Sequence, residues 1–251
     1  MNKALENIIN ESQNIVLFTG AGISCPSGIP DFRSADGLYK SKNRGKYSPE
    51  ELVSHDCLMN DPEAFFDFYF KNMVYPGARP NYAHLFFAQM EREGKLKAVV
   101  TQNIDGLHSM AGNSVVYELH GSVYRNYCVR CGKGWDPYNK TTDDNNKMFG
   151  LEYVLKETGI PKCSRCSGMV RPDVVLYGEP LDPVVWEKAE KAIEQADCLI
   201  VVGSSLTVYP AAGLVQYFRG RKLVIINKQA TPFDDMADLV LRKDIIEVLR
   251  G

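Results

Sequence analysis

Four of the seven cysteines form two closely spaced pairs, Cys128-x-x-Cys131 and Cys163-x-x-Cys166. Each pair can present two thiolates to one tetrahedral metal ion, and the same chain supplies both pairs. Two redox-active pairs are the alternative, but neither pair lies at a strand-to-helix junction of a βαβ unit. We therefore predict one structural Zn²⁺, bound by Cys128, Cys131, Cys163 and Cys166. Four thiolates fill its coordination shell, so we expect this ion to stabilise the fold and perform no chemistry.

A glycine turn, Gly20-Ala21-Gly22, directly follows an apolar run at residues 15–19. In dinucleotide-binding proteins the first glycine of such a turn makes the bend, and the second lets the backbone approach a pyrophosphate. Here Cys25 occupies the place of the third glycine, and no acidic residue stands at the end of a second strand about 20 residues later. The ordinary dehydrogenase fingerprint therefore fails. Phosphate binding and a purely structural turn both remain open.

Polar side chains follow other apolar runs where a strand should end. Gln102, Asn103 and Asp105 follow residues 97–101, and ligands of open α/β sheets bind beyond the carboxyl ends of the strands. These side chains are therefore expected to form a polar binding surface. His120 follows a shorter run, and a single histidine is more often a packed or surface residue than a catalytic one.

Two later segments fit contacts to ribose and phosphate. Gly203-Ser204-Ser205 follows residues 198–202, and Asn227-Lys228 ends the run at 223–226. Hydroxyl and amide groups of this kind bind sugar and phosphate oxygens. A serine pair after a strand is equally common as the N-cap of a helix.

The elements that must position these residues alternate between strands and helices along the chain. Short runs rich in β-branched residues are separated by helical patterns, which is typical of a parallel sheet covered by helices. Asn81 and Asp182-Pro183 are expected to start two of these helices. The predicted fold class is α/β with a Rossmann-like sheet. Its expected strands are 15–19, 97–101, 198–202 and 223–226, with weaker candidates at 115–119 and 238–241.

Two stretches interrupt this pattern and predict a smaller inserted domain. Ser48-Pro49 and Asp61-Pro62 start short helices in the first stretch, and the second contains the four paired cysteines. The aromatic residues around Phe65 are most simply the core of a small helical module. We expect a Rossmann-like domain of residues 1–34, 77–121 and 174–251, and a small domain of residues 35–76 and 122–173.

Composition excludes several classes of protein. The 251 residues are 45% hydrophobic and 24% charged with a net charge of −2, so the chain lacks the basic excess of a general nucleic-acid binder. It has neither the apolar segment of a signal peptide nor the run of about 20 apolar residues that spans a membrane. We expect a cytoplasmic monomer that does not bind nucleic acid or membranes. In a reducing compartment, Cys25, Cys57 and Cys198 are expected to be small buried side chains.

Taken together, these motifs closely resemble the sirtuin family of NAD-dependent protein deacylases. The resemblance covers essentially the whole chain, and five ordered motifs at compatible spacing are far more specific than any one of them. The segments that carry it are Gly20-Ala21-Gly22-Ile23-Ser24, Gly28-Ile29-Pro30-Asp31-Phe32-Arg33-Ser34, Thr101-Gln102-Asn103-Ile104-Asp105-Gly106-Leu107-His108, His120-Gly121, the two cysteine pairs and Gly203-Ser204-Ser205.

The resemblance implies an NAD site between the two domains. The pocket for the nicotinamide carboxamide would be formed by Asn103, Ile104 and Asp105, with Gln102 and His120 facing the adjoining ribose. A loop from about Asp31 to Tyr39 would close over the cofactor. The implied NAD-binding residues are Gly20, Ala21, Gly22, Cys25, Asp31, Phe32, Arg33, Tyr39, Gln102, Asn103, Ile104, Asp105, His120, Gly203, Ser204, Ser205, Asn227, Lys228, Asp244 and Ile245.

The implied reaction transfers an acyl group from lysine to ADP-ribose. The acyl oxygen attacks C1′ of the ribose as nicotinamide leaves, and His120 then acts as general base on a ribose hydroxyl, with Asn103 as the other catalytic residue. An imidazole with a pKa of about 6.5 suits this proton transfer at neutral pH. No hydride moves, which is consistent with the missing dehydrogenase acid.

The resemblance also implies that an acyl-lysine protein or peptide binds as an extended strand between the domains. The matching residues are Val175, Tyr177, Gly178, Glu179, Val208 and Tyr209. Family members selective for succinyl or malonyl groups carry a tyrosine followed three residues later by an arginine. Here Asn72 follows Tyr69 at that spacing. Without this cation we expect acetyl or longer neutral acyl groups.

Two other functions compete with deacylation. Some sirtuin relatives are assigned protein mono-ADP-ribosyltransferase activity at the same NAD site, although His120 and the complete segment 102–105 favour deacylation. A zinc-containing module that binds protein without catalysis is the alternative from another class.

Overall fold

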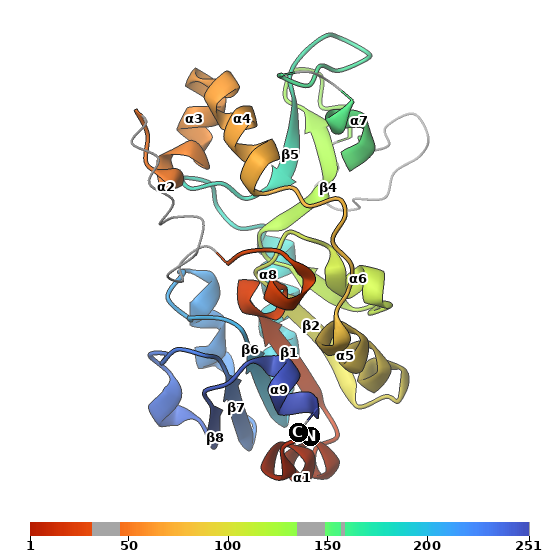
Figure 1. The fold of residues 1–251 in the computed structure, drawn as a ribbon, viewed down its shortest axis with the longest axis vertical. Helices are drawn as coiled ribbons and strands as arrows, with labels where there is room; N and C mark the ends of the chain where they lie inside the picture. Colours follow the sequence, from red (N-terminus) through yellow and green to blue (C-terminus); the bar gives the residue numbers. More distant parts are fainter. Residues whose placement is uncertain (32–45, 135–148, 157–158, 251) are drawn as a thin grey trace.

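The computed structural model describes residues 1–31, 46–134, 149–156 and 159–250. Its largest element is a six-stranded parallel sheet in the order β3-β2-β1-β6-β7-β8 (Figure 1). The direction of winding reverses between the central strands β1 and β6, which is the point where open α/β sheets bind their ligands. The strands are β1 (Ile15–Thr19), β2 (Leu96–Thr101), β3 (Val116–Glu118), β6 (Cys198–Val202), β7 (Lys222–Ile226) and β8 (Leu239–Leu241).

Helices cover both faces of this sheet because its central strands are apolar on both sides. In β1, Ile15 and Leu17 pack in the core under α1 (Lys3–Glu11), α5 (Tyr82–Arg92) and α9 (Ile245–Arg250). Val16 and Phe18 pack in the opposite core, under α8 (Pro183–Glu194) and the 3₁₀ helix η4 (Ala211–Tyr217). This alternation of side chains gives each layer its own core. The predicted α/β class, with a Rossmann-like parallel sheet, is confirmed.

The predicted helix starts are also confirmed by their capping contacts. The side chain of Asn81 accepts a hydrogen bond from the Ala83 N–H at the start of α5, and Asp182 caps α8 with Pro183 as its first residue. These contacts satisfy amides that have no partner inside the helix. The turn after β1 differs from a dinucleotide fold of the usual kind. Two short 3₁₀ helices, η1 (Ala21–Ile23) and η2 (Cys25–Ser27), follow it in place of one long helix.

A second, smaller unit lies beyond the carboxyl ends of the large sheet (Figure 1). Its antiparallel pair, β4 (Gly121–Cys128) and β5 (Val170–Val174), was not predicted because the polar residues in β4 hide the strand pattern. The helices of this unit are α2 (Pro49–Leu52), α3 (His55–Asn60), α4 (Pro62–Asn72) and α7 (Leu151–Leu155).

The small unit has a hydrophobic core of its own. Phe65, Phe66, Phe68 and Tyr69 of α4 are all buried there, as expected for core packing. We propose that this core, together with the two cores on the faces of the large sheet, marks two domains with the boundaries predicted above. The large one is completed by the helix α6 (Leu107–Ala111) and the short η5 (Asp234–Met236). Within the described part of the chain, no helix has the length and apolar character needed to cross a membrane.

Candidate active site

A cavity of about 440 Å³ opens where β1, β2, β6 and β7 end, beneath the small unit. Its walls contain every sequence-predicted NAD-site and substrate-site residue that the structure describes, so segments far apart in the chain meet here. Phe32, Arg33 and Tyr39 lie outside the described residues. The predicted residues in the walls are Gly20, Ala21, Gly22, Cys25, Asp31, Gln102, Asn103, Ile104, Asp105, His120, Val175, Tyr177, Gly178, Glu179, Gly203, Ser204, Ser205, Val208, Tyr209, Asn227, Lys228, Asp244 and Ile245.

Three glycines let the loops after β1 and β6 cross in direct backbone contact. The Gly22 N–H donates to the Gly203 carbonyl at 2.9 Å. A Cβ on Gly22 would lie 2.7 Å from the Gly203 Cα, and one on Gly20 would lie 2.8 Å from the Gly203 oxygen. Gly203 itself has φ +62°, where side chains are disfavoured. The glycine turn therefore has the structural role that the sequence left open, and it also lines the cavity.

Asp105 and Asn103 are held by a shared serine, Ser24, which directly follows η1. The Ser24 hydroxyl donates to the Asp105 carboxylate at 2.6 Å and accepts from the Asn103 amide at 3.1 Å. Burial raises the pKa of Asp105, while the hydrogen bonds from Ser24 and the Leu107 N–H oppose that rise. An amide beside a carboxylate presents both a donor and an acceptor, which is the complement of a carboxamide group.

His120 connects β3 to β4 and is fixed through one ring nitrogen. Its Nδ1 lies 2.8 Å from the Gln102 carbonyl oxygen, which can only accept, so Nδ1 carries the hydrogen. Among the described residues none bonds to Nε2, which is left as a free base in the cavity wall. Burial lowers the pKa of His120, and the Gln102 carbonyl partly offsets this. The neutral imidazole is therefore the form present at neutral pH.

The predicted peptide-binding segment links the two units. The Val175 N–H donates to the His120 carbonyl at 3.0 Å, and Tyr177 pairs with Val53 and His55 of the helical module through backbone hydrogen bonds of 3.1 and 2.9 Å. Tyr209, at the mouth of the cavity, is 61% exposed. Glu179 lines the cavity as predicted, and its carboxylate also binds Arg171, His55 and the Leu176 N–H.

At the β7 end of the cavity, Lys228 and Asp244 form an ion pair of 3.0 Å that raises the pKa of Lys228. Cys25 also lines the cavity. Burial raises the pKa of its thiol, which favours the thiol over the reactive thiolate. It is only partly buried, however, whereas Cys57 and Cys198 are buried as predicted.

Sequence reasoning missed several residues of the cavity wall. Ser24 belongs to a quoted motif but was given no role, although its position after a glycine turn marks a strand end. Val123 and Tyr124 follow His120 on β4, and recognising that strand would have placed them beside it. The wall residues that sequence reasoning did not assign include Ser24, Val53, Met73, Tyr75, Val123, Tyr124 and Pro210.

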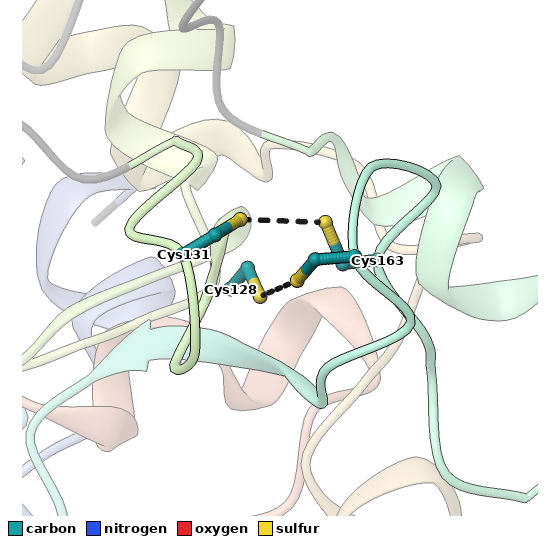
Figure 2. Close-up of side chains that lie close together, drawn as sticks. Cys128, Cys131 and Cys163 are labelled. Atoms are coloured by element: carbon teal, nitrogen blue, oxygen red, sulfur yellow. Dashed lines mark hydrogen bonds between the residues drawn. The ribbon is translucent and has the colours of Figure 1, made fainter.

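The four paired cysteines form a separate centre in the small unit. Their sulfur atoms all lie within 4.8 Å of one another. One pair comes from the end of β4 and the turn after it, and the other comes from the segment before β5 (Figure 2). The Sγ atoms of Cys128 and Cys166 are 3.5 Å apart, and those of Cys131 and Cys163 are 3.8 Å apart. A zinc tetrahedron with Zn–S bonds of about 2.3 Å has edges of about 3.8 Å. The donor set and its spacing therefore fit the predicted structural Zn²⁺.

The cavity likewise fits a dinucleotide. It lies at the reversal point of the sheet, its floor has glycines without side chains, and its two ends offer different donors. Asn103 and Asp105 suit a carboxamide at one end. Ser204, Ser205 and Asn227 supply hydroxyl and amide groups for ribose or phosphate at the other.

Comparison with known proteins identifies the family of this chain. The family model described as Sir2 family matches residues 20–210, which is most of the chain. The chain belongs to the Sir2 family. Its similarity to curated members extends over nearly the full length. It is 54% identical to an NAD-dependent protein deacetylase of Clostridium acetobutylicum, over 98% of this chain and 95% of that protein. A Staphylococcus aureus protein of the same name is 44% identical over 99% of this chain and 96% of that protein.

Solved Sir2 structures share the fold. A Sir2 variant with a deacetylated p53 peptide and 3′-O-acetyl ADP-ribose matches with a TM-score of 0.86 and 39% identity, over 100% of this chain and 96% of that one. A Sir2 complex with a p53 peptide and NAD⁺ matches with a TM-score of 0.81 and 39% identity, over 99% and 95% of the two chains. The sequence-based resemblance to this family is therefore confirmed.

Proposed function

We propose that this chain is an NAD-dependent protein deacetylase that removes an acyl group from a lysine side chain and passes it to ADP-ribose. The observation that carries the proposal is the state of His120. Its Nδ1–H is bound to the Gln102 carbonyl, and its Nε2 is free in a cavity whose other walls suit a dinucleotide and a peptide. Full-length relatives of the Sir2 family bear the same name.

Different residues of the cavity are expected to bind the cofactor and to move the proton. When NAD is bound, it supplies a ribose carbon from which nicotinamide departs and to which the acyl oxygen can add. Asn103 and Asp105 would orient the carboxamide, and Ser24 keeps both of them in place. His120 would take a proton from a ribose hydroxyl at Nε2. Its lowered pKa keeps that nitrogen unprotonated near neutral pH.

We also propose that the peptide binds along residues 175–179 and beside Val208 and Tyr209. Relatives of known structure include Sir2 bound to an acetylated peptide. The Tyr177 N–H already donates to the Val53 carbonyl, so this segment forms backbone hydrogen bonds with a neighbouring segment. This supports the proposal that an extended peptide binds beside it through its own backbone.

The acyl group is proposed to be acetyl or a longer neutral group. Asn72, which lines the cavity, donates its side-chain N–H to the Phe68 carbonyl at 2.9 Å. The described cavity wall contains two lysines, Lys228 and Lys243, and they follow β7 and β8, whereas Asn72 belongs to α4. We expect an acetylated or propionylated peptide to react faster than its succinylated counterpart, measured at equal peptide concentration. Faster desuccinylation would contradict this.

The test of the function is incubation with NAD and an acetyl-lysine peptide. We expect deacetylated peptide, nicotinamide and O-acetyl-ADP-ribose in equal amounts. In His120→Ala we expect the rate to fall by at least about a hundredfold, because a general base is removed. ADP-ribose attached to the acceptor protein would indicate the transferase alternative. Tight peptide binding without NAD consumption would indicate a binding module. A cytoplasmic location and a monomeric state remain predictions.

A further inference from the structure

A chain of hydrogen bonds connects His120 to the buried His108 on α6, and it passes through the peptide group between Gln102 and Asn103. The carbonyl of this group belongs to Gln102 and accepts from His120 Nδ1 at 2.8 Å. Its N–H belongs to Asn103 and donates to the Thr101 hydroxyl at 3.0 Å. The carbonyl and the N–H of this planar group are therefore both hydrogen-bonded, on opposite sides. Together the two hydrogen bonds fix the direction of the Gln102 carbonyl.

The Thr101 hydroxyl is itself held by a second pair of buried groups. Thr19, at the end of β1, donates its hydroxyl to Thr101 at 2.8 Å. The Thr19 oxygen also lies 3.1 Å from Nε2 of His108 on α6. Because the single hydroxyl hydrogen of Thr19 already goes to Thr101, His108 must be the donor in this contact. The hydrogen of its ring therefore sits on Nε2.

The residues at the His108 end of this chain of hydrogen bonds are buried. Thr19 is 0% exposed, Thr101 and His108 are 2% exposed, and Asn103 is 8% exposed. The ring of His84 packs edge-on against His108 at 4.9 Å. Burial lowers the pKa of His84 to about 4 and that of His108 far below its usual value, so both rings are neutral. An unbonded hydroxyl at this depth is costly, which favours the contact between Thr19 and Thr101. In the described part of the chain, Nε2 of His84 and Nδ1 of His108 have no hydrogen-bond partner.

We propose that His108 is a positioning residue for the reaction: through Thr19 and Thr101 it fixes the Gln102–Asn103 peptide plane, and that plane selects the His120 tautomer whose free Nε2 acts as the base. The inference rests on the proposed function for its catalytic consequence, but its structural claim concerns a ring that can be observed without substrate. His108 touches neither the cavity nor the reacting atoms, since the described cavity wall does not include it.

The decisive variants each remove or restore one hydrogen-bonding group in this chain of contacts. Thr19→Val and His108→Phe remove a donor while keeping most of the volume. Thr19→Ser restores the hydroxyl, and His108→Gln restores an N–H that can reach Thr19. Thr231→Val is the matched control, because Thr231 is a buried threonine outside the cavity whose hydroxyl donates to Asp234 at 2.6 Å.

The first readout is the ¹⁵N spectrum of the histidine rings in the protein without NAD. The chain has four histidines, so each ring can be assigned by substitution. We expect His120 to carry its hydrogen on Nδ1 in the wild type and in Thr231→Val. In Thr19→Val and His108→Phe we expect a mixture of the two tautomers, and in Thr19→Ser and His108→Gln a return toward the Nδ1 form.

The second readout is the kinetics of peptide deacetylation. Because only a fraction of His120 would retain a free Nε2, we expect kcat to fall by about tenfold in Thr19→Val and His108→Phe, with KM for the peptide changing by less than about twofold. The restoring variants should recover most of kcat. A purely structural role would instead lower the amount of folded protein and leave kcat per folded molecule unchanged, as expected for Thr231→Val.

Retention of the Nδ1 form and of full kcat in folded Thr19→Val would overturn the inference. If Thr19→Val does not fold, the same comparison between His108→Phe and His108→Gln decides it. Should the wild type show no deacetylation while the ring spectra still change as expected, the proposed function fails and the positioning role stands.

Discussion

At the scale of single residues, Glu179, which is expected to bind the substrate, also binds several groups of the protein itself. Its carboxylate accepts from the guanidinium of Arg171, from the Leu176 N–H and from His55. Burial by itself would raise the pKa of Glu179, but these hydrogen bonds outweigh it and lower the pKa from 4.5 to about 2. The charged form is therefore the one that stabilises the peptide-binding segment.

We predict that Glu179→Gln lowers the free energy of unfolding by about 2 kcal/mol at pH 7, because a charge-assisted contact to Arg171 is lost. A carboxyl group with a depressed pKa stabilises the fold above its unfolded pKa and loses that effect as the pH falls through its folded pKa. The deficit of the variant should therefore shrink between about pH 4.5 and pH 2. Urea unfolding at several pH values measures this, and a deficit that grows toward low pH would contradict it.

At the scale of elements, the crossing of the loops after β1 and β6 depends on the absence of side chains. A Cβ on Gly203 would lie 2.4 Å from the Ile23 nitrogen, and its φ of +62° adds backbone strain. We predict that Gly203→Ala costs at least about 2 kcal/mol of stability and weakens NAD binding, because the loops must separate.

Thermal unfolding and NAD titration of the purified variant measure both effects. Gly77→Ala is the matched control, since nothing lies within 4 Å of the added atom there. Equal losses in the two variants would show that the crossing has no special role.

The cysteine pairs lie at one end of the two-stranded sheet formed by β4 and β5. Cys128 ends β4, and the Val129 N–H donates to the Met169 carbonyl just before β5, so the metal would hold the open end of this sheet. We predict about one equivalent of zinc per chain, lost in the double variant Cys163→Ser with Cys166→Ser. Faster amide exchange in β4 and β5, without change in β1 and β6, should accompany the loss. Cys198→Ser, outside the cluster, should keep its zinc.

At the scale of the whole molecule, Arg125 joins the large sheet to the small one. It donates to Glu118 at the end of β3 at 2.5 Å and to Asp173 on β5 at 2.8 Å. Burial by itself would lower the pKa of Arg125, but the two carboxylates raise it. Glu118 and Asp173 flank the segments that carry His120 and Val175, so this cluster lies where the chain passes between the two units.

We predict that Arg125→Met destabilises the protein by about 3 kcal/mol at pH 8, because two shielded carboxylates lose their cation. Thermal unfolding of the variant and the wild type tests this. Breaking the exposed pair of Lys71 and Asp67, whose side chains are 67% and 64% exposed, should have almost no effect.

The elements that could be predicted from the sequence are those with regular local patterns of apolar and capping residues. Strand β1 and helix α5 follow from apolar periodicity and from the Asn81 cap, and both were located within a residue. Strand β4 was missed because it mixes polar and aromatic residues and pairs with β5 across more than 40 residues of chain. Its stability comes from burial in the small core and not from local preference.

The sequence by itself determined the kinds of chemistry: thiolates at metal spacing, an amide and a carboxylate after one strand, and an imidazole after another. These depend on residue type and short spacing, which the chain carries directly. Only the tertiary structure decided which partners they meet. It directs His120 Nδ1 to the Gln102 carbonyl, ties Glu179 to Arg171 and buries His108 behind the cavity. These contacts form when distant segments pack, because burial of apolar surface and the cost of unpaired polar groups select one arrangement of the whole chain.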